Sequence, residues 1–382
     1  MKLIAAITVL LAAQLVAAPP PKLVREIDLN QIIPGRPGYL PFPYFAFSPD
    51  EKWLAVTFGA LPTDPRKRLP NGRQVGTYTL LLMPVNGPAD QQVQIDPGLR
   101  PLANPGWSPS SDTFFVPGLA ANARNSRTDG IVKVWNLRGE ELFRRTLLDI
   151  GPPGGIFGFL DPEHLLVRGG STRKRHEFEI LDLHGKVVDT WTVPKHWRVV
   201  DISPDRHLLA VLSDEQAAQT LVVDYPSKQV VLAKDNPYDF LLASGGSGEY
   251  FTEDGRTLCS VGSVGDPQFD TVTECWDVDS GKRIAKFDGF LGGAPAAASS
   301  HGSRLVLTNN AVLPKRSAAL VYFHAERVVW DFRAGTEFAA WDTPQTVVPN
   351  PSHIHDSVVI SSTGRYVAET VGALLRIYEI PC

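Results

Sequence analysis

The sequence predicts an all-β protein built from a repeated unit of strand, polar turn and strand. The unit is clearest at 45–56, 200–211 and 359–368, where a turn containing Ser separates two apolar segments. The 382 residues also include 32 Gly and 32 Pro, which favour short strands joined by tight turns. A unit that recurs at a period of tens of residues is typical of a repeat architecture.

The turn of this unit can be followed along the whole chain. Its first residues are Ser48, Ser108, Asp161, Ser203, Glu253, Ser300 and Ser361, and successive first residues are 42 to 61 positions apart. A unit of this length accommodates four short strands and their loops, as in one blade of a propeller. The spacing therefore predicts a seven-bladed β-propeller.

A second hairpin follows most of these turns. Apolar strands at 131–135, 178–182 and 272–276 each lead into a polar turn, with Gly139, Gly185 and Gly281 supplying the residue that a tight hairpin needs. In the sixth unit, either 318–324 or 327–332 supplies the corresponding third strand. The order of strands and turns is therefore the same in most units.

Three dipeptides end strands of this second hairpin: Trp135-Asn136, Trp276-Asp277 and Trp330-Asp331. They stand where the WD40-like and PD40-like repeats of seven-bladed propellers carry a Trp-Asp pair, and the chain resembles these repeats from residue 19 to its end. The Gly-His pair of the fuller WD40 pattern is missing. The resemblance is therefore to the looser, exported bacterial type.

The two ends of the chain predict how the ring closes. The last unit stops at 375–380, as a third strand without a fourth, whereas 22–29 is a strand without a unit of its own. Pairing the two segments would complete the last blade and remove an exposed sheet edge. The alternative is a loose N-terminal tail.

Residues 1–18 predict a secretory signal peptide. Lys2 precedes an uncharged apolar run from Leu3 to Val16, and Ala17 and Ala18 are small residues suited to cleavage. The run is short for a membrane-spanning helix, which needs roughly 20 apolar residues. We therefore expect a periplasmic or secreted protein in which 19–382 form one propeller domain. An uncleaved membrane anchor is the alternative.

An exported protein can form disulfides, and the chain contains Cys259, Cys275 and Cys382. If the segments around the first two form a hairpin in which Val264 faces Asp270, the same register places Cys259 opposite Cys275. Opposed Cα atoms are about 4.5–5.5 Å apart, which is within the disulfide range. The register predicts a Cys259–Cys275 bridge, with two buried free thiols as the alternative. Cys382 has no evident partner.

The sequence contains no recognisable catalytic motif. It lacks a G-x-S-x-G elbow, a P-loop and an H-E-x-x-H pair. His353 and His355 supply too few ligands for zinc, and 277–281 lacks the bidentate Glu of a calcium loop. We predict no catalytic residue, metal site or cofactor. The net charge of −4 also gives no basic excess that would favour nucleic acid.

Basic residues gather in the loops that join the second and third strands of the first three units. They are Arg66, Lys67, Arg68 and Arg73, then Arg124 and Arg127, then Arg173, Lys174, Arg175 and His176. The next two units carry Asp214, Glu215, Asp266 and Asp270 instead. These loops project from one face of a propeller, and arginines suit carboxylate or phosphate groups. We predict a face that is basic on one side. An ordinary solvated surface is the alternative.

Two classes of function are consistent with these patterns. The first is a monomeric binding module that takes a protein or a small acidic ligand on the basic loops. The second is an enzyme such as a lactonase or a lyase with its site at the central channel, which the resemblance to seven-bladed propellers permits. The fold alone does not decide between them, because function depends on sites carried by the fold.

Overall fold

The computed structural model describes most of the chain. The described residues are 20–32, 43–60, 77–120, 130–147, 158–171, 175–194, 197–203, 207–213, 219–235, 249–251, 255–264, 270–291, 295–298, 304–312, 321–331, 336–343, 346–348, 357–371 and 373–381. Residues 1–18, which carry the predicted signal peptide, and Cys382 lie outside these ranges. Among the described residues, no helix is long and apolar enough to cross a membrane.

The described strands form seven antiparallel sheets. The first three sheets contain β2 (Tyr44–Phe47), β3 (Trp53–Ala60), β4 (Thr77–Pro84) and β5 (Val93–Ile95); β6 (Leu99–Pro101), β7 (Gly106–Trp107), β8 (Thr113–Ala120), β9 (Gly130–Asn136) and β10 (Glu141–Leu147); and β11 (Gly158–Phe159), β12 (His164–Ser171), β13 (Arg175–Asp182) and β14 (Val187–Pro194). The next two contain β15 (Trp197–Ile202), β16 (Leu208–Ser213), β17 (Gln219–Asp224) and β18 (Gln229–Asp235); and β19 (Glu249–Phe251), β20 (Thr257–Val264), β21 (Asp270–Asp277) and β22 (Arg283–Leu291).

The sixth sheet has five strands, like the second, and the seventh takes one strand from the N-terminal part of the chain. One contains β23 (Pro295–Ala298), β24 (Arg304–Val312), β25 (Val321–Asp331), β26 (Thr336–Asp342) and β27 (Thr346–Val348). The other contains β28 (Ser357–Ile360), β29 (Tyr366–Val371) and β30 (Leu374–Glu379), and its fourth strand is β1 (Lys22–Asp28), which pairs antiparallel with β30. Two short 3-10 helices, η1 (Leu29–Gln31) and η2 (Ala89–Gln91), lie beside β1 and before β5.

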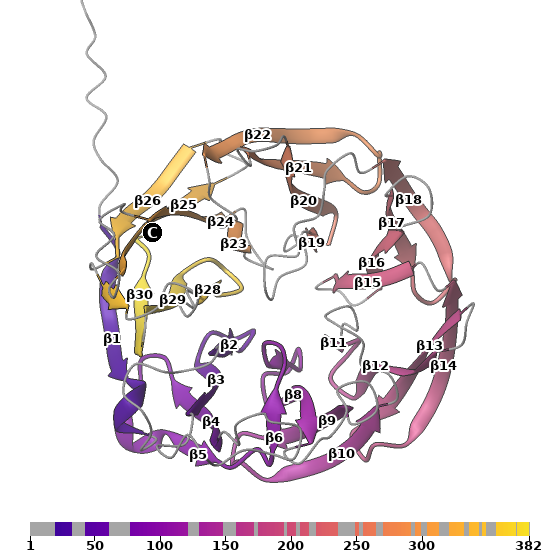
Figure 1. Cartoon of the computed structure of the whole chain (residues 1–382). Coiled ribbons are helices and arrows are strands. Elements are labelled where there is room, and N and C mark those ends of the chain that lie inside the picture. The colour runs from indigo at the N-terminus through magenta and orange to yellow at the C-terminus, as the bar shows by residue number, and fades with distance from the viewer. Residues whose placement is uncertain are drawn as a thin grey trace, which may run out of the picture.

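The sheets are arranged around a common centre (Figure 1). In most sheets the first strand lies nearest the centre, and β5, β10, β14, β18, β22, β26 and β1 lie at the rim. The chain passes from one sheet to the next around this centre, so its first and last strands meet in one sheet. This is the architecture of a β-propeller, and the all-β propeller prediction is confirmed.

The hydrophobic core lies between neighbouring sheets. One cluster joins Leu80 and Leu82 of β4 to Trp107, Phe114 and Trp135 of the next sheet. Another joins the last sheet to the first, where Leu375 and Ile377 belong to the same cluster as Phe45, Leu54 and Met83. Burial of these apolar side chains between neighbouring sheets therefore stabilises both sheets of each pair.

The recurring turn has one structure in several sheets. At Ser48, Ser203 and Ser361 the buried serine Oγ accepts the backbone N–H of the residue five positions later, at 2.9–3.0 Å. The fourth residue of the turn has a positive φ at Glu51 (59°) and at Gly364 (78°). The serine satisfies a backbone donor that the tight turn would otherwise leave without a partner. This explains why the motif recurs in the sequence.

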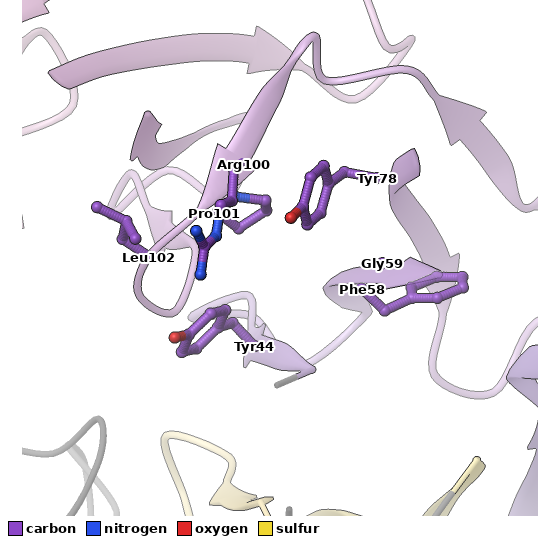
Figure 2. A pocket seen from close by; sticks show the side chains of 7 residues that line it. All are labelled: Tyr44, Phe58, Gly59, Tyr78, Arg100, Pro101 and Leu102. Carbon is purple, nitrogen blue, oxygen red and sulfur yellow. The ribbon is translucent and has the colours of Figure 1, made fainter. Parts of the chain in front are cut away.

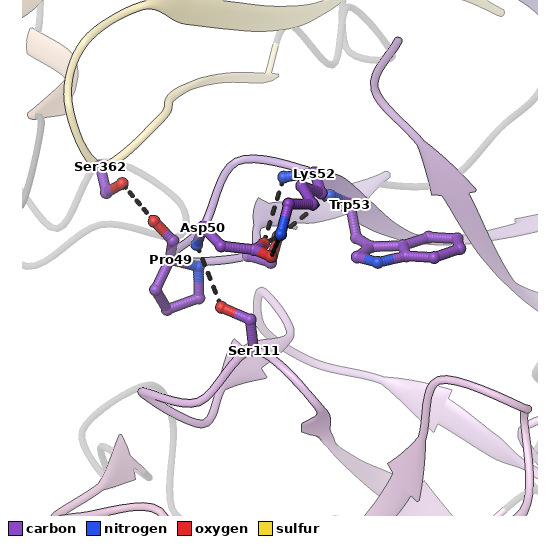
Figure 3. A network of polar contacts seen from close by, with 7 residues as sticks. Pro49, Asp50, Lys52, Trp53, Ser111 and Ser362 are labelled. Carbon is purple, nitrogen blue, oxygen red and sulfur yellow. Dashed lines mark hydrogen bonds and ion pairs between the residues drawn. The ribbon is translucent and has the colours of Figure 1, made fainter. Parts of the chain in front are cut away.

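Turns of neighbouring sheets are also bonded to one another (Figure 3). The Oγ of Ser362, after β28, donates to the Pro49 carbonyl at 2.8 Å. In turn, the Asp50 N–H donates to the Oγ of Ser111, before β8, at 3.0 Å. Thr363 donates to the Glu51 carboxylate at 2.7 Å. Polar contacts therefore link the last sheet to the first and the first to the second.

The structure answers two further questions that the sequence raised. Gly139, Gly185 and Gly281 have φ values of 78°, 76° and 66°, as the predicted hairpin turns require. β25 runs unbroken from Val321 to Asp331, so one long strand includes described residues of both candidates for the third strand of the sixth unit.

The Cys259–Cys275 disulfide is present, with Cα atoms 4.0 Å apart. β20 and β21 pair with Val264 opposite Asp270 and Cys259 opposite Cys275. The predicted register and the predicted bridge are both confirmed.

Candidate binding site

A small pocket of about 90 Å³ opens between the first two sheets (Figure 2). Side chains and backbone from β2, β3, β4 and β6 surround it. The lining residues are Tyr44, Phe58, Gly59, Tyr78, Arg100, Pro101 and Leu102. We call it the Arg100 pocket, because Arg100 is its charged residue.

The first sheet supplies the aromatic side of the Arg100 pocket. Gly59, near the end of β3, lies opposite Tyr78 on β4. A Cβ atom on Gly59 would lie only 2.7 Å from Cδ1 of the Tyr78 ring, so the glycine makes room for that ring. Tyr44 begins β2 opposite Thr57, whose Oγ1 donates to the Tyr44 carbonyl at 3.3 Å. Both tyrosines are therefore held at the same end of one sheet.

The second sheet supplies the charge. Leu99 on β6 is buried among Leu80 and Trp107, whereas Arg100, the next residue along the strand, is exposed. Alternate residues of a strand point to opposite sides, so burial of Leu99 directs Arg100 outwards. Gly118 on β8 allows β6 to approach closely, because a Cβ atom at this position would lie only 2.4 Å from the Arg100 carbonyl oxygen. Figure 2 shows the Arg100 side chain reaching between Tyr44 and Tyr78.

The electrostatics of the pocket favour an anion. Burial raises the pKa of both Tyr44 and Tyr78, and it outweighs the positive charge of Arg100, which lowers the pKa of each. Both side chains are therefore neutral phenols near pH 7, and their hydroxyl groups can donate hydrogen bonds. Within the described part of the chain, no carboxylate forms an ion pair with Arg100. The pocket offers the positive charge of Arg100, the hydroxyl group of Tyr78 and an apolar wall at Phe58.

The Arg100 pocket lies where two of the predicted basic loops begin. β3 ends at Ala60, and residues 61–76, which include four of the predicted basic residues, connect it to Tyr78 on β4. Arg100 pairs with Leu119, next to the end of β8 and to the connection 121–129. The pocket is thus at the strand ends from which the first and second basic loops leave.

Only one of the predicted ligand-binding residues falls within the described residues. Arg175 begins β13, opposite Pro194, and is exposed. The others lie outside the described ranges: Arg66, Lys67, Arg68, Arg73, Arg124, Arg127, Arg173 and Lys174. The same holds for Asp214, Glu215 and Asp266, and for His353 and His355. Their grouping on one face stays a prediction.

The turn that resembled a calcium loop is a hairpin turn between β21 and β22. The N–H of Ser280 donates to the Asp277 carboxylate at 2.7 Å, and the Gly281 N–H donates to the Asp277 carbonyl at 2.9 Å. Across the described ranges, no group of three or more His, Cys, Asp or Glu side chains is placed to hold a metal ion.

Sequence reasoning did not find the residues of the Arg100 pocket. Tyr44, Tyr78 and Arg100 are far apart in the chain, and each alone looks like an ordinary residue of a strand. The one feature of the sequence that could have pointed to this pocket is that Tyr78 lies near the start of the strand after a loop rich in arginine. The three-residue strand that carries Arg100 has too few residues to show a pattern.

No protein-family model matches the chain. No curated protein matches it either. The solved structures that share its fold include two that match nearly the whole chain. The Cps50 (Swd1) β-propeller domain of Myceliophteria thermophila has a TM-score of 0.57 and 11% identity, over 95% of this chain and 100% of that domain. A chain of a Mitotic Checkpoint Complex has a TM-score of 0.56 and 13% identity, over 96% and 98% of the two chains. At this identity the likeness establishes the β-propeller fold alone.

Proposed function

We propose that this protein is an exported binding module, a single propeller domain that takes an acidic partner or ligand on one basic face. The observation that carries the proposal is the place of the Arg100 pocket. An exposed arginine without a carboxylate partner among the described residues lies at the strand ends that continue into the Arg-rich segments 61–76 and 121–129. Positive groups on one face attract an acidic partner and raise its rate of encounter.

The fold supports a binding role. Propellers offer a broad face of loops around a centre, and one of the similar structures is part of a multiprotein assembly by its own description. We infer a comparable role in protein contact for this chain. The enzyme alternative stays a prediction, since no particular contact favours a reaction.

The remaining parts of the proposal concern the ring and the compartment. We propose that the seven sheets are seven blades of a closed ring, with β1 completing the last blade. The pairing of β1 with β30 and the core cluster shared by the last and first sheets support closure.

The disulfide supports export to an oxidising compartment, where such bonds persist. We propose a monomer.

The experiment that tests the function replaces four loop arginines. The variant Arg66→Ser, Arg68→Ser, Arg173→Ser, Arg175→Ser keeps the strands, so its melting temperature is expected to match that of the parent. We expect weaker binding of a fluorescent oligoglutamate peptide, with the largest loss at low salt, because screening acts over about 8 Å at physiological ionic strength. Equal binding by parent and variant at low salt would contradict the proposal.

A further inference from the structure

We propose that the Arg100 pocket is a subsite for one carboxylate group, which makes the protein selective for carboxylate-bearing ligands. The inference rests on the proposed function, because the pocket lies on the same basic face. It goes further in naming the residue that recognises the ligand and the chemical group that it recognises.

The geometry of arginine favours a carboxylate. A guanidinium presents pairs of parallel N–H groups that match the two oxygens of a carboxylate, in a bidentate arrangement that an ammonium cannot form. Arg100 reaches between two tyrosines (Figure 2), and the hydroxyl group of Tyr78 can add a donor at the edge of the same site. Because Arg100 has no carboxylate partner among the described residues, its charge is available to a ligand.

The size and the walls of the pocket indicate which carboxylate-bearing group it can hold. About 90 Å³ is room for a small group rather than for a whole metabolite. Phe58 is buried and Pro101 and Leu102 are apolar, so the walls suit a short aliphatic stem such as that of a glutamate side chain. A cationic ligand would be repelled by Arg100.

A phosphate fits less well than a carboxylate. A phosphate group carries close to two negative charges near pH 7, and protein sites for it commonly use several cations or a concave set of backbone N–H groups. The described walls of the pocket supply one cation. We therefore assign the pocket to a singly charged, planar anion.

The carboxylate could belong to an acidic peptide segment or to a free organic acid, and two probes separate these sources. The first is a fluorescent, acetylated oligoglutamate peptide, with oligoglutamine as its neutral counterpart. The second is glutarate, used as a competitor. If glutarate displaces the peptide at a concentration similar to the Kd of the peptide, the ligand is a free organic acid. If the peptide binds tightly and glutarate does not displace it, the ligand is an acidic protein segment. Both results support the carboxylate assignment.

The decisive variant is Arg100→Gln in the full chain. The variant loses hydrogen bonds between two charged groups, which contribute substantially to the binding free energy. The oligoglutamate Kd is therefore expected to rise by about tenfold or more. The control is Arg138→Gln, which removes an exposed arginine that pairs with Glu140 in the turn after β9, at the opposite ends of the strands. We expect the control to bind like the parent. Unchanged melting temperatures establish that both variants are folded.

The outcomes separate this inference from the proposed function. If Arg100→Gln binds oligoglutamate as tightly as the parent while the loop variant does not, the subsite assignment is wrong and the basic face stands. If Arg100→Gln weakens binding and the loop variant does not, the pocket stands and the role of the loops is wrong. Tighter, Arg100-dependent binding of a phosphoserine peptide would overturn the choice of carboxylate. No binding of any acidic probe by the parent would overturn both proposals.

Discussion

The side chains of Arg327 and Glu369 form an ion pair that is fully removed from solvent. Nε of Arg327 lies 3.0 Å from Oε2 of Glu369, and both side chains have 0% exposure. Arg327 is on β25 and Glu369 is on β29, so the pair joins two neighbouring sheets. Burial of charge is costly, and such a pair is stable only while each charge compensates the other.

We expect Glu369→Gln to destabilise the fold by about 3–5 kcal/mol, because it removes the negative charge that lies 3.0 Å from the buried Arg327 guanidinium. The control is Glu379→Gln, which removes an exposed ion pair with Arg365 and is expected to cost less than about 1 kcal/mol. Urea unfolding at neutral pH measures both. Equal midpoints for the two variants would contradict the predicted difference.

Tyr225 makes stability depend on alkaline pH. Its burial, together with the negative charge of Asp189, raises its pKa from 10.0 to about 12, and its hydroxyl donates to Asp189 at 3.2 Å. Because the pKa of Tyr225 is higher in the folded protein than in the unfolded chain, the neutral phenol stabilises the fold fully below about pH 10, the unfolded pKa. This stabilisation is lost as the pH rises towards the pKa of the folded protein.

We therefore expect Tyr225→Phe to reduce the loss of stability between about pH 10 and about pH 12. Melting temperatures of parent and variant, measured side by side across this range, test the prediction. The two curves should converge as the pH rises. Parallel curves would show that Tyr225 does not titrate as its surroundings imply.

Among the elements, the β20–β21 hairpin carries the covalent link of the protein. Cys259 and Cys275 are both buried, and their bond encloses a sequence separation of 16 residues. Closing a loop of this length restricts the unfolded chain and stabilises the folded state by roughly 3 kcal/mol in the chain-entropy account. The preceding sheet also contacts this hairpin, because Nζ of Lys234 on β18 lies 5.2 Å from the centre of the Trp276 ring on β21.

The paired change Cys259→Ser, Cys275→Ser should lower the free energy of unfolding by about that amount. The matched control is the parent in reducing buffer, which should unfold at the same urea concentration as the variant. Mass mapping of unreduced peptides from the purified protein checks that the bond forms. Free thiols at both positions would contradict the structure.

At the scale of the whole molecule, stability depends on contacts between the last sheet and the first. β1 is an outer strand of the last sheet, and Nη1 of its Arg25 donates to the Pro84 carbonyl of the first sheet at 2.9 Å. Glu26 on the same strand pairs with Arg376 on β30, with the two atoms 2.7 Å apart. The turn contacts of Ser362 with Pro49 add a second link between the same sheets.

A chain that begins at residue 30 should melt at a lower temperature than one that begins at residue 22, because it exposes the edge of β30 and loses the contacts of Arg25. The effect should exceed that of a typical surface substitution, which is about 0.5 kcal/mol or less. The chain that begins at residue 22 serves as the control, since it keeps all of β1. Equal melting temperatures would show that β1 does not close the ring.

The sequence by itself determined the local features of this protein. The recurring serine turn, the glycine hairpins and the disulfide register followed from side-chain alternation and turn chemistry, which act over a few neighbouring residues. The propeller followed from the repetition of this local unit along the chain. Only the tertiary structure decided which distant residues meet. Arg100 lies between Tyr44 and Tyr78, and Arg327 pairs with Glu369, because adjacent sheets pack at particular offsets. Those offsets depend on how buried side chains fit between sheets, and no short pattern in the chain encodes that fit.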